Sequence, residues 1–230
     1  MLISVVIPTL DAESRLPACL DALVPASIAG LVQEVIVVDG GSVDATTIIA
    51  DGFGARILVS EPGRGGQLRI GADAARGDWL LFLHADTVLS EHWRTEAAAF
   101  IQTSPDKAAV FTLRFDTSGL APNLVASGGM VRTRLLKRPY GDQGLLISTA
   151  LYQSIGGFRD FPLMEDVDFM KRLTRRYGRD VLHVFQSEAL TSADRYEREG
   201  YVRRVFRNAV LLARFQMGAS PEQLALDYGK

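Results

Sequence analysis

The sequence is poor in cysteine and histidine and has no excess of basic residues. Its 230 residues contain three histidines and one cysteine, Cys19, which excludes an intramolecular disulfide and a cysteine-rich metal site. Because a lone cysteine fits a reducing compartment, we expect a cytoplasmic protein. The 25 basic and 27 acidic residues give a net charge of −2, which argues against nucleic acid as a partner.

The sequence also lacks the run of ~18 apolar residues that a membrane-spanning helix needs. The first residues, MLISVVIPTL, have no basic segment typical of a signal peptide, and Pro8 follows too early. The nearest candidate, VFRNAVLLARFQM at 205–217, is interrupted by Arg207, Asn208 and Arg214. We therefore expect no transmembrane segment, whereas contact with a membrane surface stays open.

The first hundred residues alternate short apolar runs with helical patterns. The runs predict strands at Ile3–Ile7, Val35–Val38, Arg56–Val59 and Trp79–Leu83, and the patterns between and after them predict helices at 13–24, 44–52, 67–77 and 91–102. Because the strands are almost continuously apolar, they predict a mostly parallel sheet with helices on both faces, a Rossmann-like α/β fold.

The second half is less regular. It predicts strands at Val110–Phe115, Leu145–Ser148 and Val181–Phe185, a helix from MEDVDF to Tyr177 and a long helix over 197–217. One face of that long helix carries Val202, Val205, Phe206, Ala209, Val210, Ala213 and Met217. Residues 123–138 are mixed and contain a basic cluster. Because there is no repeat or linker, we expect a single domain over 1–230, with halves at 1–115 and 116–230.

Four polar or glycine-rich segments follow predicted strands. They are PTLDAE at 8–13, VDGGSVD at 38–44, EPGRGGQ at 61–67 and HADT at 84–87. The carboxyl ends of parallel strands meet at one rim, where ligands of such sheets bind. The segments therefore predict a binding site at that rim.

The polar residues of these segments have different interpretations. Asp39 ends a strand beside two glycines and suits contact with a base or ribose, whereas Asp44 is more simply a helix cap. Asp86 suits a hard divalent cation, whereas His84 is more simply a hydrogen-bonded structural residue. Arg64 is either a phosphate partner or part of a plain flexible loop, because GRGGQ is not a known phosphate-binding fingerprint.

Two groups of charged residues in the second half also have more than one interpretation. The acidic residues of MEDVDF at 164–169 either complement a helix dipole or include a general base. The arginines in or near the last long helix form a solvated face, hold phosphates or contact anionic lipid; they are Arg195, Arg203, Arg204 and Arg207.

Taken together, these motifs resemble the family 2 glycosyltransferases of GT-A fold. SVVIPTLDAE is similar to the family's opening strand and loop, and VIVVDGGSVDAT to its VVDxxSxDxT segment. HADT and MEDVDF stand where the family keeps its DxD-type and ED motifs. The resemblance is strong over 2–115 and looser over 140–200. GRGGQ, HADT and GDQG resemble most a subgroup of small bacterial transferases of poorly defined substrate.

The resemblance implies roles for named residues. Asp39 would bind the base of a nucleotide-sugar donor, with Pro8, Thr9 and Glu13 lining the same pocket. Asp86 would hold Mn²⁺ or Mg²⁺ between the phosphates, and Asp166 would be the catalytic base with Glu165 beside it. To these we add, from charge and position, Arg64, Gln67 and Arg195 on the donor side and Asp142 and Gln143 on the acceptor side.

Three departures from the family pattern bear on these roles. Asp11 replaces the usual asparagine of the opening loop. His84 replaces the first acid of DxD, which leaves one carboxylate for metal. The later basic-aromatic motif is reduced to Asp194-Arg195-Tyr196, which weakens the role of Arg195 and argues against processive polymer synthesis.

We therefore expect an inverting glycosyltransferase that moves a sugar from a nucleotide-sugar, with UDP as the carrier, to an unidentified hydroxyl. The basic cluster at 132–138 and GDQG indicate an anionic or lipid-linked acceptor. One alternative is a non-catalytic nucleotide-sugar-binding protein, which the missing DxD acid favours. The other is a sugar-phosphate nucleotidyltransferase, which the lack of a lysine in 63–67 disfavours.

Overall fold

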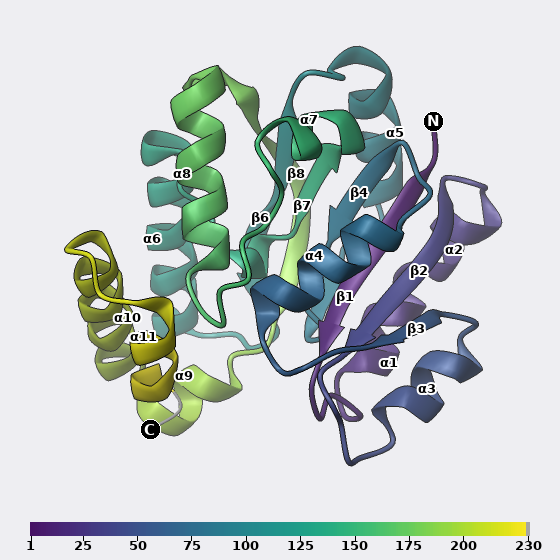
Figure 1. Ribbon diagram of the computed structural model, residues 1–230. Helices are drawn as coiled ribbons and strands as arrows, with labels where there is room; N and C mark the ends of the chain where they lie inside the picture. The colour runs from purple at the N-terminus through teal and green to yellow at the C-terminus, as the bar shows by residue number, and fades with distance from the viewer. Residues whose placement is uncertain (229–230) are drawn as a thin grey trace.

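The fold is built on an eight-stranded sheet in the order β3-β2-β1-β4-β7-β6-β8-β5 (Figure 1). A computed structural model describes residues 1–228. The strands are β1 Ile3–Thr9, β2 Val32–Asp39, β3 Arg56–Val59, β4 Trp79–Phe82, β5 Thr87–Leu89, β6 Ala108–Phe115, β7 Leu145–Ser148 and β8 Leu182–Thr191. Strands β7 and β5 run antiparallel to their neighbours, and the other pairings are parallel, which confirms the mostly parallel sheet.

Helices cover both faces of the sheet, as the apolar strands predict. They are α1 Leu16–Asp21, α2 Val24–Ile28, α3 Thr46–Gly52, α4 Arg64–Ala74, α5 Trp93–Thr103, α6 Leu120–Leu136, α7 Thr149–Ser154, α8 Glu165–Tyr177, α9 Asp194–Glu199, α10 Tyr201–Gln216 and α11 Pro221–Tyr228. Alternate residues of β1 serve two cores: Val5 and Ile7 pack with α1 and α5, whereas Val6 packs with α4 and α8. Figure 1 shows α4 and α8 in front of the sheet.

Several predicted boundaries in the first half are wrong. The helix expected over 13–24 is two short helices, because Pro25 has no backbone N–H to continue the first and instead opens α2. The loop expected at GRGGQ is the first turn of α4, with Gly63 as its N-cap. Asp44 is not the N-cap of α3, because Ala45 occupies that position. The carboxylate of Asp44 nevertheless accepts from the backbone N–H of Thr46 at 2.9 Å.

The second half differs more from expectation. Residues 123–136 of the mixed stretch belong to α6, and β5, α7 and α11 were not predicted at all. Strand β8 runs on to Thr191 instead of ending at Phe185. The helix expected over 197–217 is broken into α9 and α10 at Gly200, whose φ of 84° a residue with a side chain rarely adopts. Within residues 1–228, no helix has the length and hydrophobicity to cross a bilayer.

Helix α10 turns its apolar face outward. An apolar helix face usually packs on the core. Here Val202 and Phe206 are 86% and 70% exposed, whereas Arg204 on the opposite face is 3% exposed. The arginines of this helix therefore do not form a simple solvated face.

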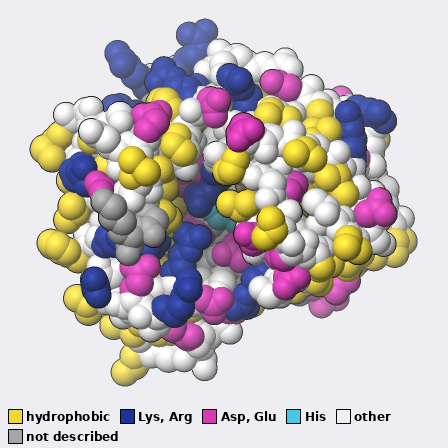
Figure 2. Space-filling view, turned by 60° about the horizontal axis from the view of Figure 1, so that its bottom comes forward, with side chains coloured by type: hydrophobic (Ala, Val, Ile, Leu, Met, Phe, Trp, Pro, Cys, Tyr) yellow, Lys and Arg dark blue, Asp and Glu magenta, His cyan; other side chains and the backbone are white. Residues whose placement is uncertain are grey.

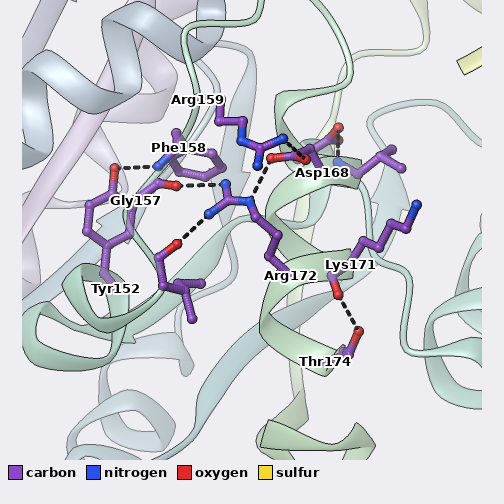
Figure 3. A network of polar contacts seen from close by, with 11 residues as sticks. Tyr152, Gly157, Phe158, Arg159, Asp168, Lys171, Arg172 and Thr174 are labelled. Carbon is purple, nitrogen blue, oxygen red and sulfur yellow. Dashed lines mark hydrogen bonds and ion pairs between the residues drawn. The ribbon is translucent and has the colours of Figure 1, made fainter. Parts of the chain in front are cut away.

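A polar network fixes the segment between α7 and α8 (Figure 3). Asp168 accepts from Arg159 at 3.1 Å and from Arg172 at 2.8 Å, and Arg172 also donates to the carbonyls of Ile155 and Gly157. These bonds hold the backbone of 155–160 in place. That backbone in turn packs against the start of α4, where Gly65 donates to the carbonyl of Phe161 at 3.0 Å.

Candidate active site

The carboxyl ends of β1 and β4 open into a cavity of about 790 Å³. Its walls come from residues 8–12, 14 and 15, the start of α4, residues 84–86, residues 140–142, the start of α8 and the inner face of α10. Figure 2 looks into this hollow and shows acidic and basic side chains around it. The predicted site residues that line the cavity are Pro8, Thr9, Arg64, Gln67, Asp86, Asp142, Asp166 and Arg195.

Four predicted site residues lie outside the cavity wall: Glu13, Asp39, Gln143 and Glu165. Gln143 is fully buried, accepts from the Thr133 hydroxyl at 2.7 Å and donates to the Phe111 carbonyl at 3.0 Å. Its amide therefore supports the fold behind the cavity, and the structure does not bring it to an acceptor.

Asp39 lies at the same rim, but its carboxylate is occupied by its own turn. One oxygen accepts from the hydroxyls of Thr9 and Ser42, and the other accepts from the backbone N–H groups of Gly41 and Ser42 at 3.0 and 2.8 Å. These bonds hold the pKa of Asp39 below its ordinary value, against the effect of burial. Asp39 is therefore a carboxylate at pH 7.

The polar residues after β1 and β2 hold the two loops together. The Asp11 carboxylate accepts from the Val43 N–H at 2.9 Å, and the Glu13 carboxylate accepts from the Ala45 N–H at 3.0 Å. In the opposite direction, the Asp44 carboxylate accepts from the Glu13 N–H at 3.0 Å. These three carboxylates therefore stabilise the backbone of the two loops that form the rim.

Gln67 joins the carboxyl ends of the neighbouring strands β1 and β2. Its side-chain amide donates to the carbonyls of Thr9 and Val38, both at 2.8 Å, and the residue is 5% exposed. Thr9 is the last residue of β1, Val38 is the last but one of β2, and the Thr9 carbonyl also accepts from the Gly40 N–H at 2.8 Å. Its amide supports the cavity floor.

Three carboxylates converge on the cavity from different elements: Asp86 after β4, Asp142 after α6 and Asp166 in α8. Burial, together with the charges of Asp166 and Asp86, raises the pKa of Asp142 to about 6, against the opposing charges of Arg132 and Arg64. Burial also raises the pKa of Asp86, whereas Arg195 and Arg64 oppose this. One oxygen of Asp142 is buried without a hydrogen-bond partner among the described residues. The cluster therefore favours a cationic ligand or a proton.

Two backbone hydrogen bonds hold the carboxylate of Asp166 at the cavity wall. One oxygen accepts from the Gly141 N–H and the other from the Val167 N–H, both at 2.7 Å. Gly141 packs so closely that a side chain there would meet the His84 ring at 2.6 Å. Burial and the nearby cations Arg64 and Arg195 lower the pKa of His84 well below its ordinary value, so the ring is neutral.

Glu165 lies behind the cavity wall and pairs with Arg64. The two side chains are 3.3 Å apart, Glu165 is fully buried, and its second oxygen has no hydrogen-bond partner within residues 1–228. Burial raises the pKa of Glu165 to about 7, and Arg64 opposes this rise. The pair fixes the guanidinium of Arg64 at the cavity edge.

Several residues that line the cavity carry no recognisable signal in the sequence. Arg15 lies two positions after PTLDAE and pairs with Asp116 at 3.0 Å and with Asp194. The hydroxyl of Tyr228 accepts from Arg195 at 2.8 Å, and the Arg204 guanidinium lies 4.5 Å from its ring centre. No local pattern links residue 228 to the rim, because α11 reaches the cavity only through tertiary packing.

The residues present fit a divalent cation only in part. Among residues 1–228, no group of three His, Cys, Asp or Glu side chains is arranged as a metal site. Asp86 nevertheless supplies one carboxylate inside the cavity, beside the unpartnered oxygen of Asp142. Mg²⁺ and similar hard ions bind through one or two carboxylates together with substrate phosphates and water. This donor set fits a cation that arrives with a diphosphate.

Replacing Glu165 with glutamine is expected to remove part of the pH dependence of stability. The pKa of Glu165 rises from 4.5 to about 7 on folding, so the folded state keeps a proton that the unfolded chain releases. This contribution, on the order of 3 kcal/mol, is complete below the unfolded pKa and is lost as pH rises through the folded value.

Urea unfolding of both proteins between pH 4.5 and 8 measures this effect. We expect the wild type to lose free energy of unfolding, relative to the glutamine variant, as pH rises. The contribution of His84 has the opposite sign, but both proteins contain it, so it cancels in the comparison. A difference between the two proteins that does not change with pH would contradict the prediction.

Comparison with known proteins agrees with this geometry. The model of glycosyl transferase family 2 matches residues 4–176. A PGL/p-HBAD biosynthesis glycosyltransferase of Mycobacterium bovis (strain BCG / Pasteur 1173P2) is 33% identical over 176 residues, which cover 72% of this chain and 67% of that protein. A glucosyl-3-phosphoglycerate synthase of Mycobacterium tuberculosis is 30% identical over 150 residues, or 60% of this chain and 46% of that protein.

Solved structures show the same fold. The glucosyl-3-phosphoglycerate synthase of Mycobacterium tuberculosis in complex with Mn²⁺, UDP and glucosyl-3-phosphoglycerate superposes with a TM-score of 0.62 and 24% identity, over 83% of this chain and 71% of that chain. The expected GT-A architecture is therefore confirmed. The matched part of this chain covers about two thirds of the mycobacterial PGL/p-HBAD glycosyltransferase and of a further mycobacterial protein of known structure. The family match and the sheet-rim cavity agree that this chain belongs to family 2 of the glycosyltransferases.

Proposed function

We propose that this glycosyltransferase moves a sugar from a UDP-sugar to an acceptor hydroxyl and inverts the anomeric centre. The observation that carries the proposal is the meeting of Asp86, Asp166, Arg64 and Arg195 in one cavity at the carboxyl ends of β1 and β4. Such a cavity of about 790 Å³ is large enough for a nucleotide-sugar and part of an acceptor.

The nucleoside would lie over the ends of β1 and β2. Pro8 and Thr9 line the cavity there, and Asp39 lies beside Thr9 on the neighbouring strand β2 and accepts from its hydroxyl at 2.9 Å. A base N–H would replace the Ser42 hydroxyl as a donor to Asp39. Glu13 would act from outside the cavity by holding the loop of Pro8 and Thr9 against residues 43–45.

The diphosphate would lie between Asp86 and the arginines. Arg64 is presented by the buried Glu165, and Arg195 is held by Tyr228, so both guanidinium groups are ready to neutralise phosphate charge. Asp86 would hold a divalent cation, which when bound supplies further positive charge to the leaving diphosphate. In this assignment Glu165 is a positioning residue.

Asp166 would act as the general base. Its carboxylate takes the proton of the acceptor hydroxyl while that oxygen attacks the anomeric carbon from the face opposite the diphosphate. The bond from the anomeric carbon to the diphosphate oxygen breaks, and the electron pair leaves with UDP. Attack from the opposite face inverts the configuration at the anomeric carbon.

The acceptor would enter beside Asp142. This residue lines the cavity between Tyr140 and the start of α8, next to Asp166. Arg132 stacks on Tyr140, with its guanidinium carbon 3.4 Å from the ring centre, so a cation borders this entrance. An anionic acceptor would be attracted there, and the mycobacterial synthase has been solved in complex with such an anion, phosphoglyceric acid.

Calorimetric titration with UDP and GDP, each with Mn²⁺, with Mg²⁺ and with EDTA, tests the proposal. We expect UDP to bind with micromolar affinity in the presence of either cation and at least tenfold more weakly with EDTA (roughly 1.4 kcal/mol or more). The two neighbour structures with UDP and Mn²⁺ or Mg²⁺ support this expectation.

The other outcomes are distinct. If EDTA does not change the affinity for UDP, Arg64 and Arg195 would neutralise the charge of the leaving diphosphate without a cation. Failure of both nucleotides to bind would overturn the proposed donor. Tight UDP binding with no hydrolysis or transfer of a UDP-sugar would favour the alternative of a non-catalytic binding protein, which the single carboxylate at Asp86 keeps open.

A further inference from the structure

The outer surface of α6 and α10 is unusually apolar for a face exposed to water. Ten of the 22 large hydrophobic side chains that the described chain leaves exposed lie on these two helices or directly after α10. They are Leu120, Leu124, Val131, Leu135 and Leu136 on α6, Val202, Val205, Phe206 and Val210 on α10, and Met217, the residue that follows α10. We call this set the α6–α10 surface.

The two helices are neighbours and face the same side of the molecule. They contact each other, and in Figure 1 both lie on the left side of the molecule, with α6 also packed against β6. Figure 2 shows hydrophobic side chains along the left edge of the molecule. Exposed apolar side chains gathered in this way mark an interaction surface, whereas single ones scattered over a protein do not.

The charge of α6 indicates the partner. Residues 117–141 contain four cations, Arg132, Arg134, Lys137 and Arg138, and no acidic residue. Arg134 and Arg138 are exposed and have no acidic partner within the described part of the chain. Arg203 adds an exposed cation on α10. A helix face that combines large apolar side chains with unpaired cations fits the interface of a bilayer that carries anionic lipids.

A second copy of the chain fits less well. In a symmetric dimer the same surface faces itself, so the cations of α6 would approach each other without carboxylates on that helix. A bilayer has no such conflict, because its phosphate groups supply the negative charge.

We propose that the α6–α10 surface docks the protein on the surface of an anionic phospholipid bilayer. This inference does not depend on the proposed sugar transfer. It also explains the inverted orientation of α10, whose apolar face would enter the lipid while Arg204 and Leu211 of its inner face line the cavity. The cavity would then lie beside the membrane surface.

Flotation of the full chain with lipid vesicles tests the proposal. The probes are vesicles of phosphatidylcholine alone and vesicles with about 40% phosphatidylglycerol, at low and high salt. We expect binding to the anionic vesicles only, weakened about tenfold or more at high salt because the Debye length shrinks to roughly 3 Å at 1 M.

Two pairs of substitutions assign the binding to this surface. The double variants Val202→Asn with Phe206→Asn, on α10, and Leu124→Asn with Leu135→Asn, on α6, should each reduce vesicle binding by about tenfold or more. The matched control is Ile28→Asn with Ile48→Asn, since these side chains are similarly exposed, at 82% and 73%, on other helices. The control should bind vesicles as the wild type does.

Three results would overturn the proposal. The first is absence of binding to anionic vesicles by the wild type. The second is equal loss of binding in the control, or none in either surface variant. The third is a wild-type dimer in analytical ultracentrifugation that the α10 variant converts to a monomer, which would assign the surface to a second copy. Because all four positions are exposed, circular dichroism should show each variant folded.

Discussion

Replacing Asp166 with asparagine is expected to reduce sugar transfer by about 10³-fold while leaving UDP affinity within a factor of about three. The amide has almost the same shape, but it cannot accept the proton of the acceptor hydroxyl. Asp166 now accepts from the backbone N–H groups of Gly141 and Val167, both at 2.7 Å. An asparagine keeps one of these bonds through its oxygen, so the fold should survive with a modest loss of stability.

Slow hydrolysis of UDP-glucose, with water as the acceptor, provides a readout before the acceptor is identified. Calorimetry with UDP measures donor binding separately. The matched control is Asp168→Asn, because Asp168 is in the same helical turn but pairs with Arg159 and Arg172 and does not line the cavity. It should lower stability and leave turnover nearly unchanged.

Asp142 is the alternative candidate for the general base. It also lines the cavity, its pKa is about 6, and one of its oxygens has no partner among the described residues. If Asp142→Asn abolishes turnover and Asp166→Asn does not, the base is Asp142 and the assignment drawn from the ED motif is wrong.

Replacing Gly65 with alanine is expected to lower the free energy of unfolding by roughly 2–3 kcal/mol. A Cβ at this position would lie 2.2 Å from the carbonyl oxygen of Arg159 and 2.7 Å from that of Phe161. Both are backbone atoms, and the bonds of Arg172 and Asp168 hold their segment in place (Figure 3). The start of α4 would have to move, so Arg64 would be displaced and UDP affinity should fall as well.

Gly128→Ala is the matched control. Gly128 lies in the interior of α6, and no atom outside the adjacent backbone of its own helix lies within 4 Å of where its Cβ would be. Alanine is the better helix former, so this variant should be more stable by about 0.5–1 kcal/mol. Urea unfolding followed by circular dichroism measures both changes. A Gly65→Ala protein as stable as the wild type would show that residues 159–161 can shift freely, against the packing described above.

The sequence by itself was sufficient for the sheet and for the location of the site. Continuous apolar runs require burial on both faces, and this determined the parallel core of β1, β2, β3 and β4. Parallel strands bring their carboxyl ends together, so the polar segments after β1, β3 and β4 were expected to meet, and they do. Eight of the twelve predicted site residues line the resulting cavity.

Only the tertiary structure decided what each of these residues contacts. The glycines of GRGGQ suggested a phosphate-binding loop. Position 65 instead requires glycine because the backbone of residues 159–161 packs against it and leaves no room for a Cβ. Gln143 turns inward because its amide bonds to the hydroxyl of Thr133, 10 residues earlier, and to the carbonyl of Phe111, 32 residues earlier. Helical periodicity likewise revealed the apolar face of α10 but not its direction. Periodicity records which residues share a face, whereas long-range packing decides whether that face meets the core or the solvent.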